Sequence, residues 1–173
     1  MEFRILTAND AGAYWTLRLE ALESDPDAFS SSAEEHRALT VEDIAKRLCP
    51  ADPVNNFVVG AFAGNRLMGT AGFYRDKGLK ELHKGHVWGV YLTREVRGRG
   101  FGGEMMRVLL ERARQLDGVK QIKVSVTETQ VAALKLYRSL GFESLGHEAR
   151  ALKIGDRYID EHHMALFVHA PKA

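Results

Sequence analysis

The sequence has little of several features that define whole classes of protein. Its 173 residues hold a single cysteine, Cys49, which excludes an intramolecular disulfide and a cysteine-based zinc site. No stretch approaches the ~20 consecutive apolar residues that a membrane-spanning helix needs. Basic residues number 24 and acidic residues 23, so there is no excess of positive charge for binding many phosphates of a nucleic acid.

Other absences concern the organisation of the chain. There are only four prolines and no low-complexity tract, so no linker is visible, and the polar residues that follow Met1 do not form a secretory signal. Apolar residues make up 45% and charged residues 27%, which is typical of a folded globular protein. We therefore expect residues 1–173 to form one cytoplasmic domain, with no metal and with no membrane or nucleic-acid partner.

The hydrophobic pattern predicts an α/β protein. Its elements follow the order strand, two helices, three strands, helix, strand, helix and hairpin. The strand at 87–92, the helix at 104–116 and the strand at 121–126 form a unit that predicts one right-handed parallel crossover inside a mixed sheet. The remaining expected ranges are strands at 2–7, 57–63 and 66–74, helices from Asn9 or Asp10 to Pro26, from Thr40 to Pro50 and from Thr127 to Leu140, and a hairpin at 142–168.

The most informative segment is Arg-Gly-Arg-Gly-Phe-Gly-Gly at 97–103, between a buried strand and a periodic helix. Glycines allow successive N–H groups to converge on a ligand, and the start of the helix adds the positive end of its dipole. Arg97 and Arg99 add charged donors, so the segment predicts a phosphate or pyrophosphate site. A flexible turn is the alternative. The spacing does not fit a dinucleotide-binding fold, and the Lys-Ser/Thr of a phosphate-binding loop is missing.

Two motifs resemble those of the GNAT N-acetyltransferases. The acetyl-CoA motif of that family, Arg/Gln-x-x-Gly-x-Gly/Ala, matches Arg97, Gly100 and Gly102. The second motif is Asn-x-x-Ala-x-x-Leu-Tyr-x-x-x-Gly-Phe. It is matched here by Ala133, Leu136, Tyr137, Gly141 and Phe142.

The resemblance implies a GNAT fold, with a mixed, mostly antiparallel sheet and about four helices, and acetyl-CoA as the acetyl donor. Gln130 stands where the family usually has Asn. It either reaches the cofactor or completes a capping box with Thr127, and both alternatives stay open. The residues that the resemblance places at the cofactor are Val90, Tyr91, Leu92, Arg97, Gly98, Arg99, Gly100, Phe101, Gly102, Gly103, Gln130 and Tyr137.

The same resemblance suggests catalytic groups. Tyr137 corresponds to the phenol that protonates the departing sulfur, although its helical spacing with Leu136 and Leu140 also fits a core position. His86 occupies the position of the general base in some members, and a loop histidine is nearly as good an interpretation. Glu128 is a second candidate base, and a carboxylate in a first helical turn is its plainer interpretation.

The acceptor site has the weakest sequence signal. By resemblance the first two helices and their connector contribute to it, and the candidate residues are Phe29, Glu34, Tyr74 and His83. Adjacent strand residues point to opposite faces, so His162 and His163 are not expected to chelate one metal ion. Cys49 has no obvious histidine partner nearby, which favours direct transfer over an acetylated enzyme.

These observations predict an enzyme that transfers the acetyl group of acetyl-CoA to a primary amine, in a small molecule or at a peptide N-terminus. The alternative is a non-catalytic module that binds acyl-CoA. A nucleic-acid-binding role for Arg94, Arg97 and Arg99 is disfavoured by the balanced charge. A homodimer is an open option, because many GNAT proteins form dimers.

Overall fold

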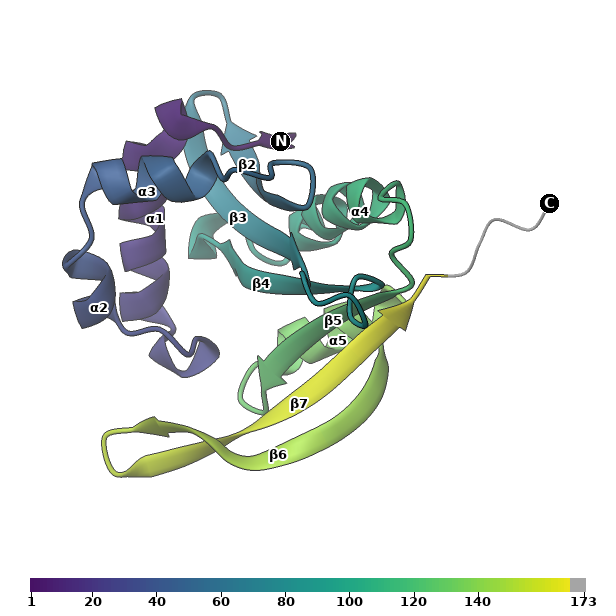
Figure 1. The fold of residues 1–173 in the computed structure, drawn as a ribbon. Coiled ribbons are helices and arrows are strands. Elements are labelled where there is room, and N and C mark those ends of the chain that lie inside the picture. The colour runs from purple at the N-terminus through teal and green to yellow at the C-terminus, as the bar shows by residue number, and fades with distance from the viewer. Residues whose placement is uncertain (169–173) are drawn as a thin grey trace.

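A computed structural model describes residues 1–168, which form a seven-stranded sheet and five α-helices (Figure 1). In this part of the chain no helix is long and apolar enough to cross a membrane. The helices are α1 (Ala11–Ser24), α2 (Ala33–Arg37), α3 (Val41–Leu48), α4 (Phe101–Arg114) and α5 (Val131–Ser139). The strands are β1 (Glu2–Ile5), β2 (Asn56–Ala63), β3 (Arg66–Arg75), β4 (Lys84–Leu92), β5 (Gln121–Thr127), β6 (Glu143–Ile154) and β7 (Arg157–Phe167).

The sheet has the order β1-β2-β3-β4-β5-β7-β6. Strands β4 and β5, which α4 connects, pair in parallel, and the other neighbouring strands pair antiparallel. This arrangement confirms the predicted fold class, a mixed and mostly antiparallel sheet with one parallel crossover.

Each face of the sheet has its own apolar core because the side chains of a strand alternate between the two faces. Phe57 and Val59 of β2 pack with α4 and α5 in one core. Val58, between them, packs with α1 and α3 in the other core. Figure 1 shows α1, α2 and α3 gathered on the left side, with the β6–β7 hairpin extending below them.

The two parallel strands separate soon after they meet. Their pairing covers Lys84 to His86 of β4 and ends at the pair of His86 with Lys123. Beyond this point the register between β3 and β4 shifts, and Gly89 has a φ of 60°. Such a bulge bends its strand, and the positive φ favours glycine. The bend opens a gap between β4 and β5.

Two local predictions were wrong. The hydrophobic pattern predicts no helix between Pro26 and Thr40, but residues 33–37 form α2 because Ser32 and Glu35 make a capping box there. Helix α5 begins at Val131, and the predicted capping box of Thr127 with Gln130 is not formed. Instead, the Thr127 hydroxyl lies 3.2 Å from that of Thr129, and the Gln130 N–H donates to the Thr127 carbonyl. The side chain of Gln130 is thereby left outside the cap.

Candidate functional site

The segment before α4 forms an open ring of backbone donors. From Gly98 through Gly102, no main-chain N–H donates to a protein acceptor within residues 1–168. After this stretch, the N–H of Gly103 is the first that donates a hydrogen bond within the chain, to the Gly100 carbonyl at 3.0 Å. Exposed, unpaired donors at the start of a helix favour a bound anion such as a pyrophosphate.

Two glycines in this ring have backbone conformations that disfavour other residues. The φ angles are 75° at Gly98 and 85° at Gly100. A Cβ atom added at either position would meet nothing within 4 Å, so the requirement for glycine comes from the dihedral angle and not from crowding. The path of the backbone through the donor ring therefore depends on glycine at these two positions.

The two arginines of the segment have different surroundings. Arg97 is held by the protein itself: its Nε donates to the Leu92 carbonyl at 2.8 Å and its Nη2 to Asp25 Oδ2 at 2.7 Å. Asp25 follows α1, so this ion pair connects the donor ring to the other core. Arg99 is exposed, and none of the side-chain hydrogen bonds described for residues 1–168 involves it. Arg99 is thus the better placed of the two to contact a ligand.

A narrow slot of about 80 Å³ lies where β4 and β5 separate. Tyr137 and Gln130 line it from the α5 side, and Val90 lines it from β4. Tyr137 is 3% exposed and packs edge-on against Phe142, and burial raises the pKa of its phenol above the ordinary range. The phenol is therefore fully protonated at neutral pH and suited to donating a proton. The two other residues expected at the cofactor on β4 are Tyr91 and Leu92. The Tyr91 side chain faces away and donates to Glu20 at 2.9 Å, and the Leu92 carbonyl is used by Arg97.

His86 lies next to the slot as part of a hydrogen-bonded pair. Its Nε2 donates to Asp76 Oδ2 at 2.9 Å, and its ring stacks on Tyr74 with the centroids 4.7 Å apart. This leaves Nδ1 of the neutral ring as a proton acceptor. A histidine oriented by a carboxylate is the arrangement that many enzymes use for a general base. Asp76 was not found from the sequence, because only the pairing of β3 with β4 brings it beside His86.

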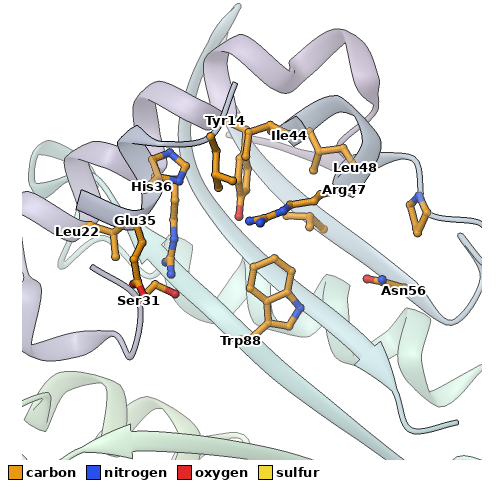
Figure 2. A pocket seen from close by; sticks show the side chains of 14 residues that line it. Tyr14, Leu22, Ser31, Glu35, His36, Ile44, Arg47, Leu48, Asn56 and Trp88 are labelled. Carbon is orange, nitrogen blue, oxygen red and sulfur yellow. The ribbon is translucent and has the colours of Figure 1, made fainter. Parts of the chain in front are cut away.

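Two larger cavities continue from the slot. One, of about 560 Å³, is lined by Phe29, Tyr74, His86 and Trp88 among others. The next, of about 600 Å³, lies between α1, α3 and β4, and Figure 2 shows Tyr14, Arg47 and Trp88 pointing into it. Trp88 borders both cavities and the slot, so the three spaces lie side by side, and together they are called the cleft.

The structure brings some predicted acceptor residues into this cleft and leaves others outside. Phe29 and Tyr74 line the cleft as expected. Glu34, His83 and Glu128 are exposed and do not line any of its three spaces. On α2 it is the next residue, Glu35, that lines the cleft.

A second histidine in the cleft was considered from the sequence only as a metal ligand. His163 Nε2 donates to Glu148 Oε2 at 2.9 Å, and its Nδ1 lies 2.9 Å from the Ser125 hydroxyl. Burial raises the pKa of the neighbouring Glu161 carboxyl. Glu148, Glu161 and His163 also place ligand atoms within 4.8 Å of one another, but His163 already uses both ring nitrogens. His162 bends away toward His147, consistent with alternation along the strand.

The fold, the donor ring before α4 and the slot between β4 and β5 together match the class of α/β acyltransferases. The model of the acetyltransferase (GNAT) family matches residues 17–142, and the chain belongs to this family. It is 36% identical over 104 residues to the N-alpha-acetyltransferase RimI of Mycobacterium tuberculosis, a match over 60% of this chain and 62% of RimI.

More distant relatives agree with this assignment. The probable spermine N(1)-acetyltransferase of Bacillus subtilis subsp. natto is 26% identical over 65% of this chain and 72% of its own. The structure of yncA from Salmonella typhimurium, solved with its cofactor acetyl-CoA, has a TM-score of 0.85 at 18% identity, over 100% of this chain and 96% of that one. At this identity the likeness concerns the fold.

Proposed function

We propose that this protein transfers an acetyl group directly from acetyl-CoA to a primary amine of a small molecule or a peptide N-terminus. The observation that carries the proposal is that one β4–α4–β5 unit carries both the donor ring at 98–102, before α4, and the slot lined by Tyr137, where β4 and β5 separate. One part suits a pyrophosphate and the other a thioester. The relatives named for acetylation of protein N-termini and of spermine support an amine acceptor.

Backbone and side-chain groups of the chain match the charged and amide groups of acetyl-CoA. The N–H groups of 98–102 would hold the pyrophosphate, and Arg99 would add a charge-assisted contact. Within residues 1–168 the edge of β4 beyond His86 has no partner strand on the β5 side, so the backbone groups on this edge that no side chain occupies would pair with the amides of the pantetheine arm. When bound, acetyl-CoA supplies an activated acetyl group at the slot.

The nitrogen of an alkylammonium group loses two protons on the way to an amide, and the departing sulfur gains one. The ammonium, with a pKa of about 10, must lose the first proton before its nitrogen can attack the thioester carbon. We assign this proton to His86 Nδ1, directly or through a water, with Asp76 holding the ring. As the carbon–sulfur bond breaks, Tyr137 donates its phenolic proton to the sulfur, and the second proton of the nitrogen restores the phenol, so that one proton is released in net. Burial disfavours the thiolate as well as the phenolate, which reduces the cost of this transfer.

The direct route follows from the position of the only cysteine. Cys49 is the exposed residue that follows α3, and it does not line the slot or either cavity. Replacing Cys49 with Ser is therefore expected to leave turnover unchanged. A loss of more than tenfold would show that an acetylated cysteine takes part.

The proposal is tested by measuring free thiol during incubation of saturating acetyl-CoA with a panel of amines. Calorimetry with acetyl-CoA alone is the companion measurement. Thiol release with at least one amine is the expected result. Binding of acetyl-CoA with no release above buffer, across the panel, would identify the non-catalytic module instead.

A further inference from the structure

One buried cationic group in the acceptor cleft has no partner. The guanidinium of Arg18, on α1, stacks on the Phe29 ring with 4.3 Å between Cζ and the ring centroid. Its Nη1 is shielded from solvent and makes no hydrogen bond within residues 1–168. Burial lowers the pKa of Arg18, but a guanidinium stays charged at neutral pH. A buried donor without an acceptor is costly, so such groups commonly mark a place where a ligand binds.

The unpaired nitrogen lies close to the point where transfer would occur. Arg18 lines both large cavities, at the boundary between them. Its Nη1 lies 3.7 Å from where a Cβ would sit on Gly89, the bulge residue that also lines the slot. A group bound by Nη1 would therefore sit near an amine placed at the mouth of the slot.

The surrounding charges leave Arg18 uncompensated. Arg47 reaches the same cavity from α3 (Figure 2), and no ion pair within residues 1–168 involves Arg18 or Arg47. Glu35 lines this cavity too, but its carboxylate accepts from the N–H and hydroxyl of Ser32 in the capping box of α2. His36 lies on the same wall, and its Nε2 donates to the Trp15 carbonyl at 2.9 Å.

We infer that the acceptor is an amino acid with a free carboxylate, which Arg18 binds while the amine faces the slot. The inference rests on the proposed function and narrows its acceptor. A carboxylate matches the fork of a guanidinium and would compensate the charge of Arg18. In an amino acid the carboxylate lies close to the amine. This matches the short distance between Arg18 Nη1 and Gly89, which lines the slot. A polyamine would bring a second cation toward Arg18 and Arg47, which is unfavourable in a partly buried site.

The first test compares free amino acids with their carboxamides as acceptors. The carboxamide has nearly the same size as the acid and keeps its amine, but it lacks the negative charge of the carboxylate. The best amino acid should exceed its own amide by about tenfold or more in kcat/KM, the effect expected from one buried charge-assisted hydrogen bond. The variant Arg18→Gln should remove this preference by raising KM for the acid alone, and Arg18→Lys should restore part of it. Arg114→Gln, on the exposed side of α4, is the matched control and should preserve the preference.

Equal or better turnover of amides or polyamines would overturn the inference. A loss of activity in Arg18→Gln that falls equally on acid and amide would also overturn it.

The second test separates this inference from the proposed function. With coenzyme A present, thermal shift is measured for a panel of N-acetyl-amino acids and their amides, which need no turnover. Selective stabilisation by acids, lost in Arg18→Gln, would support the carboxylate site even if no thiol release were found. No selectivity in this panel would refute the site even in an active enzyme.

Discussion

The two halves of the site are built in different ways. The half that we assign to acetyl-CoA comes mostly from one continuous part of the chain, from β4 through α4 and β5 to α5, with Ala28 and Phe29 added at the slot, and much of it is backbone. The acceptor side is assembled from α1, α2, α3, β4 and the β6–β7 hairpin, and its surface is side chain. A backbone site depends on local dihedral angles, whereas a side-chain cleft depends on how distant elements pack. A backbone site can therefore bind the same cofactor throughout a fold family, while a side-chain cleft changes from one member to another.

The two halves are nevertheless connected. Arg97 binds Asp25, and Arg94 donates to the Ser24 carbonyl at 2.9 Å. The Tyr91 hydroxyl reaches Glu20 and Ser24 of α1. The C-terminal end of α1 thus braces the segment that carries the donor ring, while the middle of the same helix supplies Arg18 to the acceptor cleft.

The largest effect should come from the residue where the two halves meet. Tyr137→Phe removes only the hydroxyl and keeps the contact of the ring with Phe142. We expect kcat to fall about 100-fold, within the range for loss of a general acid, with little change in the Kd of acetyl-CoA. Steady-state kinetics and calorimetry check this. Tyr158→Phe, at an exposed tyrosine of β7, is the control, and a fall of less than threefold in Tyr137→Phe would remove the acid from the mechanism.

The contrast between the halves also explains what the sequence could predict. The donor ring was found because glycines before a periodic helix have consequences within a few residues. The order of strands and the crossover followed from hydrophobic patterning for the same reason. Helix α2 was missed although Ser32 and Glu35 stand at capping-box spacing, because a five-residue helix has almost no periodicity.

The acceptor cleft was mostly beyond sequence reasoning. No motif in the sequence distinguishes Arg18 from the other polar residues of its helix. Its guanidinium becomes buried without a hydrogen-bond partner for Nη1 only because the folded chain brings it against Phe29 and Gly89. Trp88 needs the space left by Gly72 on β3, since a Cβ there would lie 2.2 Å from the indole. Both contacts join residues that are far apart in the sequence, so no local sequence pattern predicts them. Conversely, Glu34 and His83 were chosen by residue type, and their side chains lie outside the cleft.

A second prediction isolates the backbone side. Gly100→Val forces a β-branched residue to a φ of 85°, which displaces the donor ring. We expect the Kd of acetyl-CoA to rise about 10- to 30-fold, equivalent to roughly 1.4–2 kcal/mol, with the fold retained. Calorimetry and circular dichroism measure the two quantities.

The matched control for Gly100→Val is Gly64→Val in the β2–β3 turn. Gly64 also has a positive φ, 58°, and open space around it. It should lose similar stability and keep acetyl-CoA affinity. If both variants weaken acetyl-CoA binding equally, the effect at Gly100 is general destabilisation and the donor ring is not the pyrophosphate site.

A third prediction distinguishes the two histidines of the cleft. His86→Gln should lower kcat/KM for the amine about tenfold, because the group assigned as its base is lost. Asp76→Asn should have a smaller effect in the same direction, since it only releases the ring. His163→Gln should leave kcat/KM nearly unchanged. A larger loss in His163→Gln would assign the base to the chain of Ser125, His163 and Glu148.

The smallest effect concerns the connection between the halves. Burial raises the pKa of Asp25, but hydrogen bonds from Arg97 and Ser24 outweigh it and hold the pKa below its ordinary value. The stabilisation from a lowered carboxyl pKa is present above the unfolded value of about 3.9 and is lost as the pH falls through the lower folded value. Asp25→Asn should therefore cost about 0.5–1 kcal/mol of unfolding free energy at neutral pH, as expected for a partly exposed ion pair, and the difference from wild type should disappear as the pH falls through the lowered folded pKa. It should also raise KM for acetyl-CoA about two- to threefold, because Arg97 no longer braces the donor ring.

The matched control is Asp27→Asn, which breaks the comparable ion pair with Arg157 near the acceptor cleft and should leave the KM for acetyl-CoA unchanged. If Asp25→Asn and Asp27→Asn have the same KM for acetyl-CoA, the two halves are energetically independent despite their contacts.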